Sequence, residues 1–260
     1  LDFGRIVADG RDMPLAELEF ELKSGKVLDL LDEAAEASLG YGLGILTRSK
    51  SERGRVLAGA MGALAGRAPA FSFPPGAKTA EALGAFLHSV AIHLTGNVEP
   101  IREGPAPEGI HQMRVSLRRL RSALGLFRSD LTPLAAELDA MARSVLQTLG
   151  RARDLDVFVL ETLPDMELAA GAEWQEHLSA LRRSAEQDRR TAQADARELA
   201  GSPQLAGLII LLLRLAHGGA VLRSGGEEGG VGGRPDPPGR SVPEGRSQGA
   251  RFQETGMGEA

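Results

Sequence analysis

The sequence predicts a mainly α-helical protein, in which a helical bundle follows a small α+β segment and precedes a tail without regular structure. Apolar residues recur at helical spacing through the middle of the chain, whereas residues 1–23 alternate as strands do. From Gly218 onward, Gly, Pro, Arg, Ser and Glu dominate and no period survives, so this segment cannot bury enough apolar surface to offset its chain entropy. The predicted divisions are an α+β segment (1–67), a linker (68–78), a helical bundle (79–217) and a disordered tail (218–260).

Composition limits the classes of function. The formal net charge of −5 excludes a globally basic nucleic-acid binder, so any anion site must be a local patch. The absence of cysteine removes disulfides, thiolate zinc sites and cysteine nucleophiles. The most apolar run, residues 208–215, is shorter than the ~20 residues that cross a bilayer, so we expect a buried helix, no membrane partner and a cytoplasmic location. Because the first residue is Leu, we expect a fragment of a longer protein.

The N-terminal segment carries an acidic pattern. Residues 3–7 and 15–23 are predicted strands joined by a turn, and a helix is predicted over residues 27–39. In the second strand Glu17, Glu19 and Glu21 share one face, which requires water or cations opposite it. Both a solvated outer face and a set of oxygen ligands for Mg²⁺ or Mn²⁺ fit this pattern.

The helices of the bundle follow from apolar periodicity and from their start and stop signals. We expect helices over residues 79–94, 110–128, 133–149, 174–199 and 203–217. Thr79 is the predicted N-cap of the first, Thr132 and Pro133 begin the third, and Gly150 is expected to end it. His88 and His93, on the first helix, are expected to be ordinary surface or packing residues.

The helix predicted over residues 110–128 carries a row of cations. His111, Arg114, Arg118, Arg121 and Arg128 recur at spacings of three, four, three and seven, which place them on one face, and the segment contains no carboxylate. Such arginines could cover apolar surface and pair with acids on neighbouring helices. They could equally bind a polyanion, because the planar guanidinium suits phosphate oxygens.

Two motifs resemble the signatures of the CHAD family, the conserved histidine α-helical domain. They are H-Q-M-R-V-S-L-R-R-L-R-S-A-L-G-L-F at residues 111–127 and L-G-R-A-R-D-L-D-V-F at residues 149–158. The resemblance implies an all-helical domain with a groove that binds inorganic polyphosphate. The implied ligands, with Arg128 added from the cationic row, are His111, Arg114, Arg118, Arg119, Arg121, Arg128, Arg151 and Arg153. Asp154 and Asp156 could orient the last two arginines, but we favour a structural role for both.

Two further stretches are similar to the CYTH family, the triphosphate tunnel enzymes. L-A-E-L-E-F-E-L-K-S-G at residues 15–25 resembles a late strand, and G-I-L-T-R-S-K-S-E-R-G at residues 44–54 resembles the final basic strand. The resemblance implies part of a closed antiparallel barrel that binds triphosphate through Arg48, Lys50 and Arg53 and holds Mg²⁺ or Mn²⁺ through acidic residues. The family's opening E-x-E-x-K strand is missing, so we expect a remnant without catalysis.

Four functions are therefore compared. A polyphosphate-binding module is favoured, with possible granule association, and a metal-dependent triphosphatase is the alternative. A helical interaction domain ranks third. Nucleic acid is disfavoured, because one Trp and one Tyr offer little for base stacking. The resemblance to the CHAD family implies a second helical half after residue 218. We therefore expect this chain to contain the first half of that domain, and self-association could complete the groove.

Overall fold

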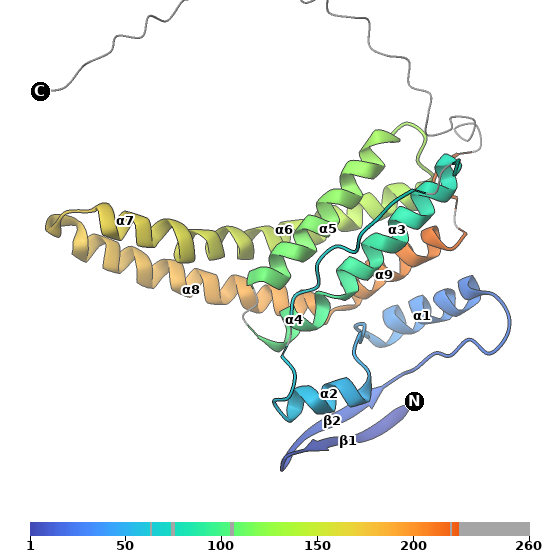
Figure 1. Ribbon diagram of the computed structural model, residues 1–260, viewed down its shortest axis with the longest axis horizontal. Helices are drawn as coiled ribbons and strands as arrows, with labels where there is room; N and C mark the ends of the chain where they lie inside the picture. Colours follow the sequence, from blue (N-terminus) through green and yellow to red (C-terminus); the bar gives the residue numbers. More distant parts are fainter. Residues whose placement is uncertain (63, 74–75, 105–106, 219, 224–260) are drawn as a thin grey trace, which may run out of the picture.

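The structure is a computed structural model that describes residues 1–62, 64–73, 76–104, 107–218 and 220–223. Over these residues it is a helical protein with one two-stranded antiparallel sheet, which confirms the predicted fold class (Figure 1). The elements are β1 (Asp2–Ala8), β2 (Arg11–Glu17), α1 (Val27–Tyr41), α2 (Lys50–Leu57), α3 (Thr79–Thr95), α4 (Val98–Glu103), α5 (Pro107–Leu126), α6 (Pro133–Val157), the π-helix η1 (Phe158–Thr162), α7 (Leu163–Ala169), the 3-10 helix η2 (Ala172–Trp174), α8 (Gln175–Ala200) and α9 (Pro203–Ala216).

The main core lies between α3, α5, α6 and α9, which pack on one another. The apolar row predicted on α5 forms its centre, since Met113, Leu117 and Leu120 are fully buried and Leu124 is 1% exposed. The most apolar predicted helix is α9, and its Leu205, Leu208 and other core side chains lie in the same cluster. Burial of these side chains, worth roughly 1.5–3 kcal/mol each, holds α5 against its neighbours.

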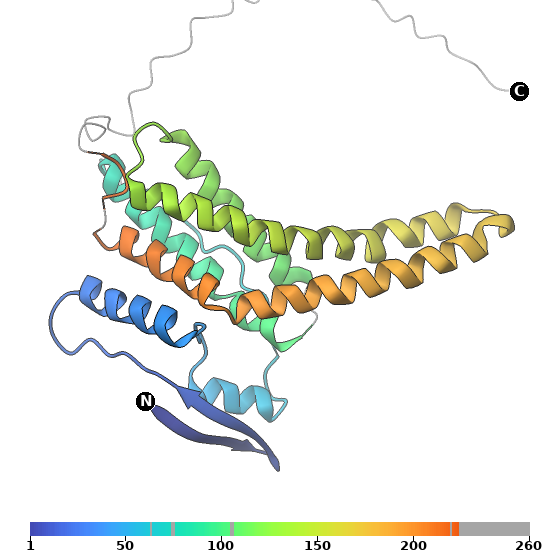
Figure 2. The ribbon, with the colours of Figure 1, turned by 180° about the vertical axis from the view of Figure 1, so that it is seen from behind.

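A long antiparallel hairpin extends from this bundle, as both ribbon views show (Figures 1 and 2). One arm runs from α6 through η1 into α7, and α8 forms the other arm. The prediction that Gly150 ends the third helix is wrong, because α6 continues to Val157. Leu149 and Ala152, on either side of Gly150, are both buried, and no proline follows before Pro164. The helix therefore continues past the glycine because packing and the helix propensity of the neighbouring residues stabilise it.

A buried carboxylate joins the two arms. Asp156 is fully buried, and its Oδ1 accepts hydrogen bonds from Arg189 Nε at 2.7 Å and Gln193 Nε2 at 2.8 Å. Both donors lie on α8. Asp156 therefore has the structural role that we favoured, and it fastens the arms rather than orienting Arg151 or Arg153.

The N-terminal segment differs from its prediction in two places. The second strand ends at Glu17, which pairs with Asp2 at the start of β1, so residues 18–22 have no partner on that strand. The basic strand predicted over residues 44–54 is wrong, because Lys50–Leu57 is the helix α2. Its N-cap Ser49 and N3 residue Glu52 form a capping box, a local signal that outweighs strand propensity here.

The remaining segments attach to the bundle. Helix α1, two residues longer than predicted at its C-terminal end, packs against α9, and the sheet and α2 lie beyond it (Figures 1 and 2). Just before the predicted linker, the backbone N–H and carbonyl of Gly66 form hydrogen bonds with the buried side-chain amide of Asn97. The N-cap of α3 is Lys78 rather than Thr79.

The start of the predicted tail also packs. Val221 and Leu222 are buried, and Leu222 forms a β-bridge with Leu131, so residues 220–223 differ from the prediction; residues 224–260 lie outside the described ranges. Among the described residues no single helix is long and apolar enough to cross a membrane. The bent pair Ala172–Ala200 and Pro203–Ala216 passes that test together, by length and composition.

Candidate functional site

Four predicted residues on α5, His111, Arg114, Arg118 and Arg121, form what we call the basic stripe. Two contacts place this stripe along the seam between α5 and α6. Arg121 Nε donates to Asp139 Oδ1 at 2.8 Å, and Arg114 Nη1 donates a longer hydrogen bond to the Leu146 carbonyl at 3.4 Å. Because residue numbers fall on α5 as they rise on α6, the helices are antiparallel, and Arg118 lies between the two contacts.

The members of the basic stripe differ in electrostatic compensation. Arg121 pairs with Asp139, which also accepts from Arg143 at 3.3 Å, so two guanidiniums share one carboxylate. Arg118 is exposed and His111 is half-buried, and within the described ranges neither has an ion pair or hydrogen bond. The structural interpretation therefore holds for Arg121, whereas Arg118 presents an uncompensated charge to solvent.

Two predicted ligands lie away from the stripe. The prediction that Arg128 shares this face is wrong, because α5 ends at Leu126 and Arg128 follows it in an exposed turn. Arg119 faces α3, where its guanidinium lies 5.7 Å from the centre of the Phe86 ring. That cation–π contact gives Arg119 a packing role.

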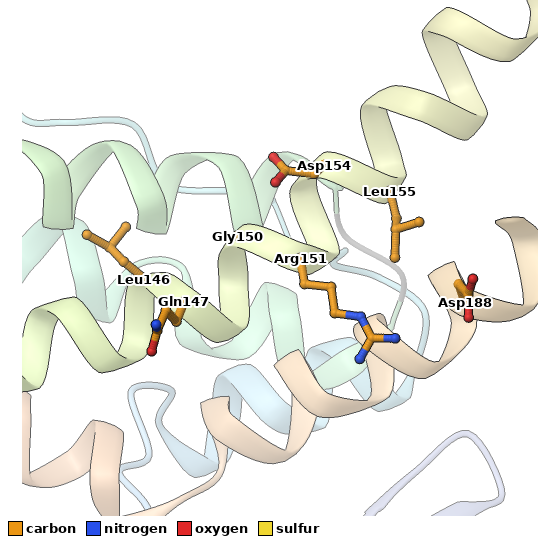
Figure 3. A pocket seen from close by; sticks show the side chains of 7 residues that line it. All are labelled: Leu146, Gln147, Gly150, Arg151, Asp154, Leu155 and Asp188. Carbon is orange, nitrogen blue, oxygen red and sulfur yellow. The ribbon is translucent and has the colours of Figure 1, made fainter.

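Arg151 borders a shallow depression of about 520 Å³ between α6 and α8. Figure 3 shows Arg151 extending from α6 toward α8, whereas Asp154 points away from α8. The lining residues are Leu146, Gln147, Gly150, Arg151, Asp154, Leu155 and Asp188. Leu146 and Gly150 belong to this lining, so the depression begins where Arg114 reaches α6.

The second arginine of that motif has a local partner. Arg153 lies 3.4 Å from Glu161 in the π-helix that continues α6. Arg151 lies two residues before Arg153, and it has no ion pair within the part of the chain that the structure describes. Arg151 is therefore unpaired among the described residues, although Asp154 and Asp188 line the same depression, whereas Glu161 partly neutralises Arg153.

The predicted triphosphate ligands near α2 are all paired with carboxylates. Lys50 Nζ lies 2.6 Å from Asp2, 2.7 Å from Glu17 and 3.3 Å from Glu19. Arg53 pairs with Glu17, and Arg48 pairs with Glu103. The Lys50 ammonium lowers the pKa of the Asp2 and Glu17 carboxyls, and these carboxylates raise the pKa of Lys50. These cations lie in pairs and not on one face of a strand.

The predicted metal ligands are only partly brought together. Carboxylate oxygens of Asp2, Glu17 and Glu19 lie within 4.8 Å of one another, whereas Glu21 lies 3.9 Å from Lys23 at the surface. Oxygen donors suit Mg²⁺ or Mn²⁺. However, the Lys50 ammonium contacts the same three carboxylates, so the residues present do not fit a divalent ion while Lys50 stays in place.

Sequence reasoning missed a polar contact beneath the stripe. His93, only 1% exposed, shares a hydrogen bond of 3.0 Å between its Nε2 and Gln112 Oε1, and burial lowers the pKa of His93. Gln112 follows His111, so this pair ties α3 to the start of the stripe. The pairing of Arg121 with Asp139 depends on the register of α5 against α6, which the sequence does not give, and nothing in the sequence pointed to the approach of Arg114 to Gly150.

Comparisons with known proteins bear on the bundle. Residues 85–238 match the family model of the CHAD domain. A crystal structure of the CHAD domain from the plant Ricinus communis is 33% identical, with a TM-score of 0.47, over 60% of this chain and 52% of that chain. The chain thus spans about half the length of that relative. No curated protein matches it.

Proposed function

The chain belongs to the CHAD family, and on that premise we propose that it binds inorganic polyphosphate along the basic stripe. One observation carries the proposal: Arg118 is exposed at the centre of the stripe without a carboxylate partner among the described residues. Arg114 and Arg121 flank it by four and three residues, about one helical turn on either side. A linear polyanion lying along the seam would meet a cation about every 5 Å.

The chemistry of the stripe favours phosphate over a single carboxylate partner. Guanidinium groups stay charged at all accessible pH values and offer a planar fork of donors to phosphate oxygens. Arg114 donates one hydrogen bond to the Leu146 carbonyl. This bond holds the guanidinium near α6 but does not neutralise its charge. Arg151 adds a further cation at the nearby depression, whereas the net charge of −5 disfavours non-specific attraction of polyanions elsewhere.

The direct test is calorimetric titration with long-chain polyphosphate over a range of salt concentrations. We expect binding that weakens steeply as salt rises, because release of condensed counterions drives such contacts. Duplex DNA at equal phosphate concentration is the control and should bind more weakly, since the cations follow one narrow seam on a chain whose net charge is −5. Equal affinity for the two polymers at moderate salt would overturn the proposal.

A second candidate is metal-dependent triphosphate hydrolysis by a CYTH-like segment. It is favoured by the cations of residues 48–53 beside the carboxylates of Asp2, Glu17 and Glu19. The ion pairs oppose it, because phosphate and Mg²⁺ or Mn²⁺ would each have to displace a partner already in place. We therefore propose that this segment, if it binds triphosphate, does so without turnover.

Partners and location follow from the first proposal. We propose a cytoplasmic protein that associates with polyphosphate granules, and we do not expect nucleic acid as a main partner. Two copies could also align their stripes on one polyphosphate chain and so complete a groove. Sedimentation with and without polyphosphate tests this, since a doubled mass only in its presence supports alignment and an unchanged mass contradicts it.

A further inference from the structure

Gly150 is an unusual residue at its position. It lies inside α6, a helix of 25 residues, where glycine destabilises relative to alanine because it has more backbone freedom to lose. It neither ends the helix nor bends into a left-handed conformation. A local backbone requirement therefore does not account for it.

The surroundings of Gly150 supply a reason. A Cβ added there would lie 2.8 Å from Arg114 Nη1 and 4.0 Å from Arg114 Cζ, and no other described residue outside the helix backbone comes within 4 Å. The same Nη1 donates to the carbonyl of Leu146, one turn earlier on α6. The Arg114 guanidinium thus occupies the space that a side chain at residue 150 would fill.

We propose that Gly150 is a positioning residue for polyphosphate binding, because its missing side chain lets the Arg114 guanidinium lie against α6 in line with the basic stripe. This inference rests on the proposed function. Gly150 also lines the depression that Arg151 borders (Figure 3), so the Arg114 guanidinium lies next to that depression. A methyl group would push away the far end of a flexible side chain, not the backbone.

Replacement of Gly150 is therefore expected to change protein stability and polyphosphate affinity in opposite directions. Replacement by alanine should stabilise α6 through higher helix propensity, and it should weaken polyphosphate binding by displacing Arg114. If Gly150 had only a structural role, its replacement by alanine would lower the stability of the protein and leave the binding of the folded protein unchanged. Stability and affinity moving in opposite directions is the signature of a positioning role.

The experiment compares Gly150→Ala with Gly125→Ala, a matched control. Gly125 is exposed on α5, and a Cβ there would meet nothing within 4 Å, so it gains helix propensity without touching Arg114. We expect both variants to melt at or above the wild-type temperature. Only Gly150→Ala should lose affinity for long-chain polyphosphate, by about tenfold, the size expected for one charge-assisted contact. Equal affinity of the two variants would overturn the inference.

Arg114→Ala separates this inference from the proposed function. If Arg114→Ala weakens binding and Gly150→Ala adds nothing to it in the double variant, Gly150 acts through Arg114. Additive losses, or a loss for Arg114→Ala alone, contradict the positioning role while leaving the proposed function intact.

A readout without ligand completes the test. The side-chain Nε–Hε resonance of Arg114 in ¹⁵N spectra should shift in Gly150→Ala and stay in place in Gly125→Ala. An unmoved resonance overturns the inference even if the protein binds no polyphosphate.

Discussion

Arg118 and Arg121 lie less than one turn apart on α5 but differ in what surrounds them. Arg121 is held by Asp139, so its charge is already compensated, whereas Arg118 is exposed without a carboxylate partner among the described residues. An arginine that has to leave a carboxylate before it binds phosphate gains less from that phosphate. Spacing alone placed both residues on one face, but it could not distinguish these roles, because Asp139 comes from another helix.

Another single residue, the buried His93, is expected to make the stability of the protein depend on pH. Burial lowers the pKa of His93 in the folded protein below its ordinary value of 6.5, so below that pH the unfolded chain binds a proton that the folded chain does not. The stabilisation is therefore complete above about pH 6.5 and is lost as the pH falls toward the folded pKa, by at most about 1.4 kcal/mol per pH unit.

Denaturant unfolding from about pH 7.5 to about pH 5 measures this effect. His93→Gln has no titrating group and keeps a polar side chain for Gln112. We expect its free energy of unfolding to change less with pH than that of the wild type. Parallel pH profiles for the two proteins would show that His93 does not contribute. The sequence predicted a packing histidine here, but it could not reveal the pairing with Gln112 across two helices.

At the scale of elements, the hairpin of α6 and α8 depends on Asp156. Asp156→Ala should lower the free energy of unfolding by about 3–5 kcal/mol, since it leaves the Arg189 charge without its buried partner. Asp154→Ala, two residues away and exposed, is the control and should change stability by less than about 0.5 kcal/mol. Urea unfolding measures both, and similar losses for the two variants would contradict the assigned role.

Most of the helices were predictable, and the failures have local causes. Thr132 and Pro133 begin α6 as expected, and the long polar and apolar helices α8 and α9 match their predictions within one residue at each end. Gly150 was misread because a stop signal acts only where packing does not oppose it. The strand expected over residues 44–54 rested on a resemblance to the CYTH family, whereas the local sequence favours a helix start, because Ser49 and Glu52 form a capping box.

At the scale of the whole molecule, the N-terminal segment predicts an absence of turnover. We expect no hydrolysis of inorganic triphosphate with Mg²⁺ or Mn²⁺, because Lys50 contacts all three carboxylates of the cluster and residues 50–54 of the implied basic strand belong to α2. Phosphate release by the purified chain is the measurement. Turnover that disappears in Glu19→Gln would contradict this expectation and revive the tunnel-enzyme alternative.

The distribution of charge links the whole molecule to the site. A chain with a net charge of −5 repels polyanions at long range, so binding has to arise from the basic stripe and its neighbours at short range. The family and the helical architecture could be predicted from the motifs, because those motifs contain both the apolar core positions and the cations. Which cations remain uncompensated depends on interhelical contacts and required the structure.

The central claim is that the basic stripe binds polyphosphate, and Arg118→Ala tests it most directly. The matched control is Arg183→Ala, which removes another exposed arginine that has no ion pair in the described ranges, from α8. Calorimetric titration with long-chain polyphosphate should show about tenfold weaker binding for Arg118→Ala and near wild-type binding for Arg183→Ala, with unchanged melting of both. Equal affinities of the two variants, or a loss of folding in Arg118→Ala with undiminished binding by its folded fraction, would contradict the claim.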